Sequence, residues 1–230
     1  FRRVLFRSIG RLCHDRGVWF FCDAAQAVGK IPIDVEAMHI DLCAFTAHKM
    51  YGPKGVGALY VRRKAPRVRL EPILHGGGHE RGLRSGTLPA HQIVGLGECF
   101  DLARREMNAE VPRVRAQRDR LWAALRELPG VRLNGDFGAR VAHNLNIGIA
   151  DCELPLSSLT DVAISSASAC ILGQASHVIA ALGGDDVSTV LRITVGRFNT
   201  DAEIDFAASY LRGKIAACRA NAEHKAAWTV

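Results

Sequence analysis

Two ionisable side chains of the sequence stand where they could act on a bound cofactor. Asp23 follows the apolar run of residues 18–22, and Lys49 lies just past a second apolar run, residues 42–45. A lysine amine can form a Schiff base with pyridoxal phosphate, and a carboxylate can keep the pyridine nitrogen of that cofactor protonated. The ordinary alternative is that Lys49 is a solvated surface residue.

The neighbours of Lys49 favour the cofactor. Thr46 and His48 carry a hydroxyl and an imidazole that can bond phosphate oxygens. A tight turn, residues 52–55 (GPKG), follows directly. These residue types together predict a phosphate-binding lysine site.

The elements that must position these residues are short strands joined by helices. We expect a helix over residues 9–16, ended by Gly17, and strands at residues 18–22, 42–45 and 56–61. Polar residues at the ends of such strands are typical of an open α/β sheet, which binds its ligands at the carboxyl edge.

Beyond residue 89 the apolar spacing is helical as far as residue 128, and such a segment suits a bridge between domains. Thr200 and Glu203 form a capping box that begins a last helix. The expected elements between them are strands at residues 131–133, 145–149 and 190–195 and a helix at residues 176–182.

Composition indicates a globular protein, since 48% of the 230 residues are hydrophobic and 23% are charged. The net charge of +7 could steer acidic partners. No aromatic residues alternate with the main basic cluster, so we expect a solvated surface and no direct nucleic-acid site. The cluster consists of Arg62, Arg63, Lys64, Arg67 and Arg69.

The seven cysteines are odd in number and lack close pairs, which favours neither a disulfide framework nor a zinc site and suits a reducing, cytoplasmic setting. Residues 162–184 carry no formal charge but are too polar for a membrane span, so no membrane contact is expected.

Five segments, in this order and spacing, resemble cysteine desulfurases of the NifS/IscS type, within the class-V aminotransferase superfamily. The resemblance covers residues 9–217. The segments are CDAAQAVGKIPID (22–34), TAHKMYGPKGVGALYVRR (46–63), HGGGHERGLRSGTLPAHQIVG (75–95), SSASAC (165–170) and LRITVGRFNTDAEID (191–205).

The resemblance assigns the cofactor site residue by residue. It implies that Lys49 is the Schiff-base lysine, that Asp23 is the partner of the pyridinium nitrogen, and that Gln26 bonds the ring hydroxyl. Thr46 and His48 match phosphate ligands of the same subunit. The implied cofactor is pyridoxal 5'-phosphate.

Three further roles come with the resemblance. Thr87 matches a phosphate ligand that is lent across a homodimer interface, Arg192 matches the arginine that holds the substrate carboxylate, and Cys170 matches the nucleophilic cysteine. Each has an ordinary alternative: Arg192 could face outward from a strand, and a free cysteine is usually a small buried hydrophobe. The other six cysteines are expected to be buried and inert.

The implied fold is the pyridoxal-phosphate transferase fold type I, an α/β architecture. The chain would hold the second half of the large mixed-sheet domain plus the small C-terminal α/β domain. Residues 1–8 are expected to be a non-native or misassembled start, and an N-terminal part of the cofactor pocket to be missing. The expected divisions are 9–100 for the large domain, 101–129 for a linking helix and 130–230 for the small domain with the cysteine loop.

The implied reaction takes sulfur from L-cysteine, giving L-alanine and a persulfide on Cys170. The implied partners are sulfur acceptors such as an iron-sulfur scaffold or tRNA-thiolation proteins. Open alternatives are a selenocysteine lyase, another class-V aminotransferase-like enzyme, or an inactive fragment that only dimerises or binds a partner. The chain by itself is expected to be inactive, and the stretch after Cys170 is shorter than the family's loop.

Overall fold

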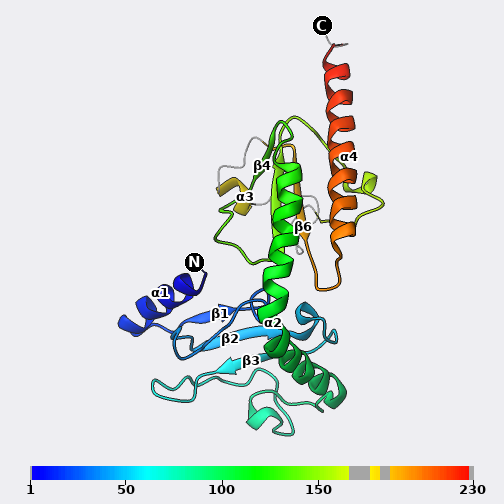
Figure 1. Cartoon of the computed structure of the whole chain (residues 1–230). Helices are drawn as coiled ribbons and strands as arrows, with labels where there is room; N and C mark the ends of the chain where they lie inside the picture. Colours follow the sequence, from blue (N-terminus) through cyan, green and yellow to red (C-terminus); the bar gives the residue numbers. More distant parts are fainter. Residues whose placement is uncertain (1, 166–176, 182–186, 228–230) are drawn as a thin grey trace. The chain divides into compact units, whose positions relative to one another are not determined.

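The computed structural model describes residues 2–165, 177–181 and 187–227 of a mixed α/β chain (Figure 1). The chain divides into two compact units, Phe1–Asn108 and Ala109–Val230. Within these described residues, each unit has one three-stranded sheet. Helix α2 (Ala90–Leu125), with Pro112 inside it, contributes residues to both units.

The first unit carries the strands predicted around the lysine. Strand β1 is parallel to β2, with Cys22 opposite Cys43, and β2 is antiparallel to β3. The carboxyl ends of β1 and β2 therefore meet at one edge of the sheet, as the sequence predicts. The elements are α1 (Arg2–Asp15), β1 (Phe21–Asp23), β2 (Leu42–Thr46), η1 (Ala47–Met50), β3 (Gly57–Val61) and η2 (Glu80–Gly82).

A buried ion pair holds this sheet together. Arg62, directly after β3, has a side chain that is 8% exposed, and its Nε lies 3.0 Å from Asp41 Oδ1. Its Nη2 donates to the carbonyl oxygen of Ile40, and the second oxygen of Asp41 accepts the Phe20 N–H. The prediction that Arg62 belongs to a solvated basic surface is therefore wrong, because its charge is paired inside the fold.

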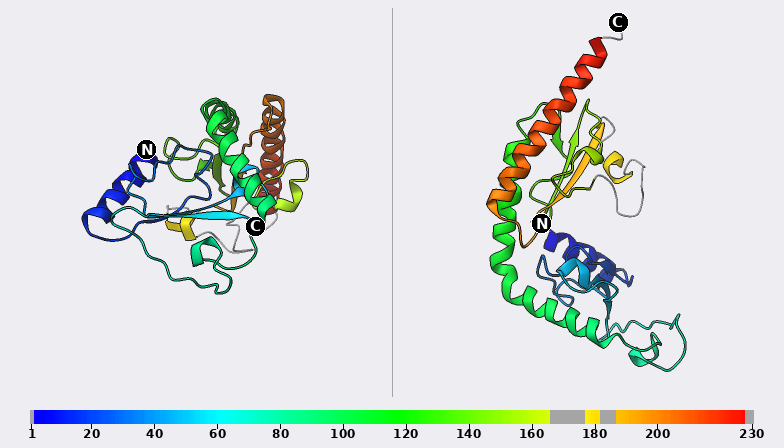
Figure 2. Two further views of the ribbon diagram at one scale, coloured as in Figure 1. Left: turned by 90° about the horizontal axis from the view of Figure 1, so that it is seen from below. Right: turned by 90° about the vertical axis from the view of Figure 1, so that its right-hand side faces the viewer.

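The second unit has an antiparallel sheet of order β4-β5-β6. Helices α2 and α4 cover one of its faces (Figure 2). The Thr200 N–H donates to Glu203 Oε2 at 2.8 Å, and the Glu203 N–H donates to Thr200 Oγ1 at 3.2 Å, so the predicted capping box is confirmed. The elements are β4 (Val131–Leu133), β5 (Asn144–Ile149), η3 (Leu156–Ser158), α3 (His177–Ala181), β6 (Thr189–Thr194) and α4 (Asp201–Ala227).

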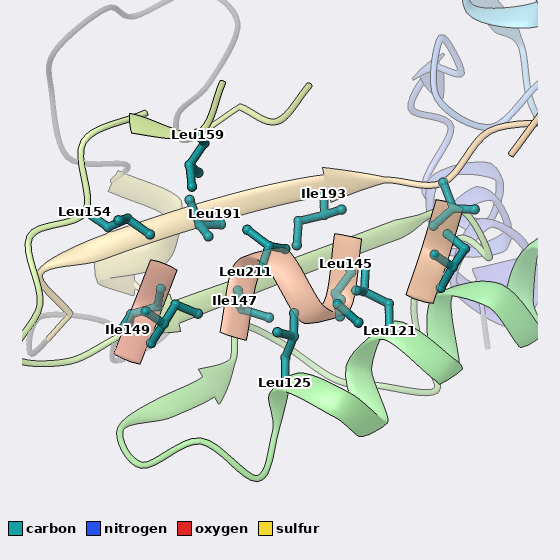
Figure 3. Close-up of a cluster of buried hydrophobic side chains, with 14 of the residues drawn as sticks. Leu121, Leu125, Leu145, Ile147, Ile149, Leu154, Leu159, Leu191, Ile193 and Leu211 are labelled. Carbon is teal, nitrogen blue, oxygen red and sulfur yellow. The ribbon is translucent and has the colours of Figure 1, made fainter. Parts of the chain in front are cut away.

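The core of the second unit lies between this sheet and its helices (Figure 3). Alternate side chains of β5 point into it, which is the two-residue period of a half-buried strand. Leu145, Ile147, Leu191, Leu125 and Leu211 are each 0% exposed. This apolar layer fixes the register of β6, since a slip of one residue would turn its buried face to solvent.

Cys152 and Cys218 form a disulfide with a Cα–Cα distance of 6.0 Å. The sequence predicts inert thiols at these positions, and the structure corrects this. The two cysteines are 66 residues apart, so their spacing in the sequence does not predict the pair. Cys22, Cys43 and Cys99 are free and buried, as predicted, whereas Cys13 is half-buried.

Candidate functional site

The carboxyl edge of the first sheet gathers most of the predicted site residues. Asp23 ends β1 and Thr46 ends β2, and the parallel register places Asp23 opposite Ala44, two residues before Thr46. Asp23 is exposed, and its Oδ1 accepts the Ala25 N–H at 2.9 Å, which fixes the carboxylate at the strand end. Gln26 is exposed in the turn that follows.

Thr46 and His48 are joined by a hydrogen bond of 2.8 Å between Thr46 Oγ1 and His48 Nδ1. The same hydroxyl lies 3.2 Å from the Val56 carbonyl oxygen, to which it can donate. When the hydroxyl proton goes to Val56, the imidazole must donate from Nδ1, which leaves Nε2 as an acceptor. When the hydroxyl instead donates to Nδ1, the neutral imidazole carries its proton on Nε2 and can offer that N–H to an anion.

Lys49 lies in the short 3₁₀ helix η1, and its side chain is exposed. Tyr51 ends the helix in the left-handed conformation, with φ 65°, which is uncommon for a residue other than glycine. Its ring lies 4.3 Å from the Lys30 ammonium. A Cβ atom on Gly52 would come within 2.5 Å of Cys99 Sγ, so glycine lets this turn pack against α2.

Thr87 is exposed in the loop before α2. The loop is closed by two bonds, from the Gly86 N–H to His79 Nδ1 at 3.3 Å and from the Gly78 N–H to Ser85 Oγ at 3.2 Å. His79 therefore has a structural role in shaping this loop. That role is the alternative to a catalytic one for a histidine of this segment.

The second unit holds the other predicted residues. Arg192 is half-buried in the middle of β6, opposite Asn146 of β5. Its other neighbour is Ser165, the first residue of the SSASAC segment, through an isolated antiparallel bridge. Sequence reasoning missed Ser165, although its place at the start of that segment was a signal. Cys170 lies outside the described residues.

The structure thus brings Asp23, Gln26, Thr46, His48 and Lys49 to one sheet edge or the turns that leave it, within the first unit. Within the parts of the chain that are described, no three histidine, cysteine or acidic side chains group as a metal site would require.

Two buried thiols lie on the strands that lead to this edge. The hydrogen bond with Cys22 and burial raise the pKa of Cys43 far above the usual range for a thiol. Cys43 is 2% exposed. Because the thiolate is the nucleophile, Cys43 is inert at neutral pH.

The family model described as "Aminotransferase class-V" matches residues 5–206. The chain belongs to the class-V aminotransferase family. It is 51% identical over 218 residues to "Cysteine desulfurase IscS" of Dechloromonas aromatica (strain RCB), a match that covers 92% of this chain and 54% of the relative. A protein of the same name from Methylococcus capsulatus is also 51% identical over 218 residues, with the same coverage.

A solved NifS-like protein from Rickettsia africae ESF-5 superposes with a TM-score of 0.81 at 24% identity, covering 91% of this chain and 57% of the other. This likeness shows the fold, and the expected pyridoxal-phosphate transferase fold type I is confirmed. The resemblance to NifS/IscS-type proteins is likewise confirmed by the sequence relatives. The chain spans about half the length of the curated relatives that it matches.

None of the helices within residues 2–165, 177–181 and 187–227 has the length and apolar character that crossing a bilayer demands.

Proposed function

We propose that this chain is the part of a cysteine desulfurase that holds the cofactor lysine and the substrate arginine. The observation that carries the proposal is the placement of Asp23, Thr46, His48 and Lys49 at one carboxyl edge of a sheet. The name shared by the 51% identical relatives, cysteine desulfurase, supports it. Removal of sulfur from L-cysteine is thus the proposed activity of the whole protein.

The donor set of the first unit fits pyridoxal phosphate. Lys49 would attach the cofactor through Nζ, Asp23 would face its ring nitrogen, and Gln26 would bond its ring hydroxyl. Thr46 and His48 would bind the phosphate, since a hydroxyl and an imidazole N–H are both anion donors. When bound, the cofactor supplies an electron sink for the substrate carbon.

The residues of the chain have separate tasks in this proposal. The Lys49 amine, once it is free, moves protons to and from the substrate. The Arg192 guanidinium holds the substrate carboxylate, for which its planar fork is well shaped. The Cys170 thiolate bonds to the sulfur of L-cysteine while the carbon–sulfur bond breaks, and a proton goes to carbon. The products balance as L-alanine and a persulfide on Cys170.

Thr87 is proposed as a phosphate ligand for the other subunit of a homodimer, and its exposure in a shaped loop fits that use. Sulfur-acceptor proteins, such as an iron-sulfur scaffold or tRNA-thiolation proteins, are the proposed partners. The cytoplasmic setting remains a prediction from the odd number and wide spacing of the cysteines.

The test of the cofactor lysine uses this chain extended to full length with the N-terminal half of the Dechloromonas aromatica relative and loaded with pyridoxal phosphate. Borohydride should fix a pyridoxyl group on Lys49, found by peptide mapping. Lys54→Ala, in the next turn, is the matched control and should leave the label in place. A label on another lysine, or none, would contradict the assignment.

The test of the sulfur acceptor compares cysteines in the same protein. Cys170→Ala should lower alanine release from L-cysteine by several orders of magnitude, because the nucleophile of a covalent step is lost. Cys13→Ala, at a free and half-buried cysteine, should leave it unchanged. Near-normal alanine release by Cys170→Ala would require another nucleophile.

A further inference from the structure

Strand β6 is an edge strand of the second sheet. On its side away from β5, Ser165 and Arg192 form an isolated antiparallel bridge. The Arg192 N–H donates to the Ser165 carbonyl oxygen at 2.6 Å, and the Ser165 N–H donates to the Arg192 carbonyl oxygen at 3.3 Å. In such a hydrogen-bonded pair the two side chains lie on the same face. Ser165 is therefore placed to touch the Arg192 side chain.

The side chains make that contact. Arg192 Nε donates to Ser165 Oγ at 3.0 Å, and Ser165 Oγ lies 3.4 Å from the Arg192 carbonyl oxygen, to which it can donate. The hydroxyl thus accepts from the guanidinium and can donate back to the main chain of the same arginine. This closed ring of hydrogen bonds fixes the direction in which the Arg192 side chain extends from the strand.

The strand beneath Arg192 is held firmly. Leu191 and Ile193, on the opposite face, are 0% and 7% exposed in the core. In the turn between β6 and α4, the Arg113 guanidinium donates to the Asn199 carbonyl oxygen at 3.1 Å and to that of Arg197, which ties this turn to α2. The backbone of Arg192 is held by β5 on one side and by the Ser165 bridge on the other, and Ser165 also contacts its side chain.

We propose that Ser165 is a positioning residue for carboxylate binding by Arg192. A guanidinium can grip a carboxylate either through Nε and Nη or through its two Nη atoms. Ser165 occupies Nε, so the Nη1 and Nη2 edge is the one presented to an α-carboxylate. Among the described residues, Ser165 is the partner found for the Arg192 side chain. This inference rests on the proposed function of Arg192.

Orientation of this kind raises affinity because less side-chain freedom is lost when the carboxylate binds. Removing the hydroxyl should therefore weaken binding of amino acids without affecting amines that have no carboxylate. If Ser165 had a purely structural role, removing its hydroxyl would weaken the binding of both classes of ligand or of neither.

The first experiment tests the contact in the 230-residue chain, by NMR of the Arg192 Nε–H in arginine-labelled protein. Ser165→Ala should speed its exchange with water about tenfold or more, as expected when a hydrogen bond to a charged group is lost. Ser165→Thr keeps the hydroxyl and should restore slow exchange. Ser157→Ala, an exposed serine in η3, is the matched control. Equal exchange in Ser165→Ala and the unaltered chain would overturn the proposal.

The second experiment compares L-alanine with ethylamine, which differ only in the carboxylate, by spectral titration of the full-length loaded protein. Ser165→Ala should weaken L-alanine binding about tenfold and leave ethylamine binding unchanged. The KM for L-cysteine should rise similarly with little change in kcat, since the carboxylate contact serves ground state and transition state alike. Ser165→Thr should reverse both effects.

Arg192→Ala separates the two proposals. It should remove the preference for L-alanine over ethylamine. If Arg192→Ala removes this preference and Ser165→Ala does not reduce it, the positioning role is overturned and the carboxylate role of Arg192 stands. If Arg192→Ala keeps the preference, the role of Arg192 itself fails, and that of Ser165 fails with it.

Discussion

The two sheets are built from strands of similar length but are covered very differently. In the second sheet, β5 and β6 bury Leu145, Ile147 and Leu191 completely against α2 and α4. In the first sheet, Leu59 of β3 is 46% exposed and Phe21 of β1 is 55% exposed. The second sheet is stabilised by a continuous apolar layer, whereas in this chain β1 and β3 each keep a large apolar side chain exposed.

The first unit compensates with polar contacts. Its Arg62–Asp41 ion pair is buried and satisfies backbone groups of Ile40 and Phe20, which precede β2 and β1. The proposed cofactor residues sit on this more open sheet, and the proposed substrate arginine on the more closed one. A packed strand makes the direction of one side chain definite.

The largest effect is expected from a substitution that disrupts the apolar layer of the second unit. Ile147→Ala should lower the free energy of unfolding of the second unit by about 4 kcal/mol, because a 0% exposed side chain leaves a cavity. Leu59→Ala in the first unit should cost less than about 1 kcal/mol. Hydrogen exchange of peptides from β5 and β3, followed by mass spectrometry, measures each unit separately. Equal losses would contradict the contrast between the sheets.

The next effect concerns the polar support of the first unit. Asp41→Ala leaves the Arg62 guanidinium buried without its Nε partner and should destabilise that unit by about 3 kcal/mol. Asp101→Ala removes an exposed partner of Arg104 and Arg105, and should change little. Urea unfolding monitored by hydrogen exchange in β2 distinguishes them. A small effect of Asp41→Ala would mean that apolar packing dominates here too.

A smaller effect is expected at the start of α4. Thr200→Ala removes the hydroxyl that caps the Glu203 N–H and should cost about 1 kcal/mol. Thr200→Ser keeps the acceptor and should restore stability. The exchange rates of the first-turn amides of α4 report the change directly, and unaltered rates would show that packing alone begins this helix.

The smallest effect is the pH dependence of the same cap. The hydrogen bond from the Thr200 N–H lowers the pKa of Glu203. The cap is therefore fully stabilising above the ordinary glutamate pKa of about 4.3 and is lost as the pH falls through the lowered value. Glu203→Gln should flatten the dependence of the melting temperature on pH between about pH 6 and about pH 3. The exposed Glu153→Gln is the control, and identical profiles would exclude this contribution.

Much of this architecture follows from local pattern. The alternation in residues 145–149, the capping residues at Thr200 and the apolar run before Thr46 each predict the element that forms. The Cys152–Cys218 disulfide and the burial of Arg62 could not be predicted, because each depends on a partner far away along the chain. The Ser165–Arg192 contact is of the same kind, since it spans 27 residues and arises only when the strand edge is formed.

The Cys152–Cys218 bond also makes the middle of the second unit a covalent ring. Ser165, Cys170 and Arg192 all lie between the two cysteines in sequence, so a protease that cuts once anywhere in that stretch cannot release a piece. The nicked protein should migrate as a single band on a non-reducing gel and separate into two only after a thiol reductant is added. Ser165, Cys170 and Arg192 therefore lie on a stretch of chain whose two pieces stay joined through the disulfide even after the backbone between them is broken.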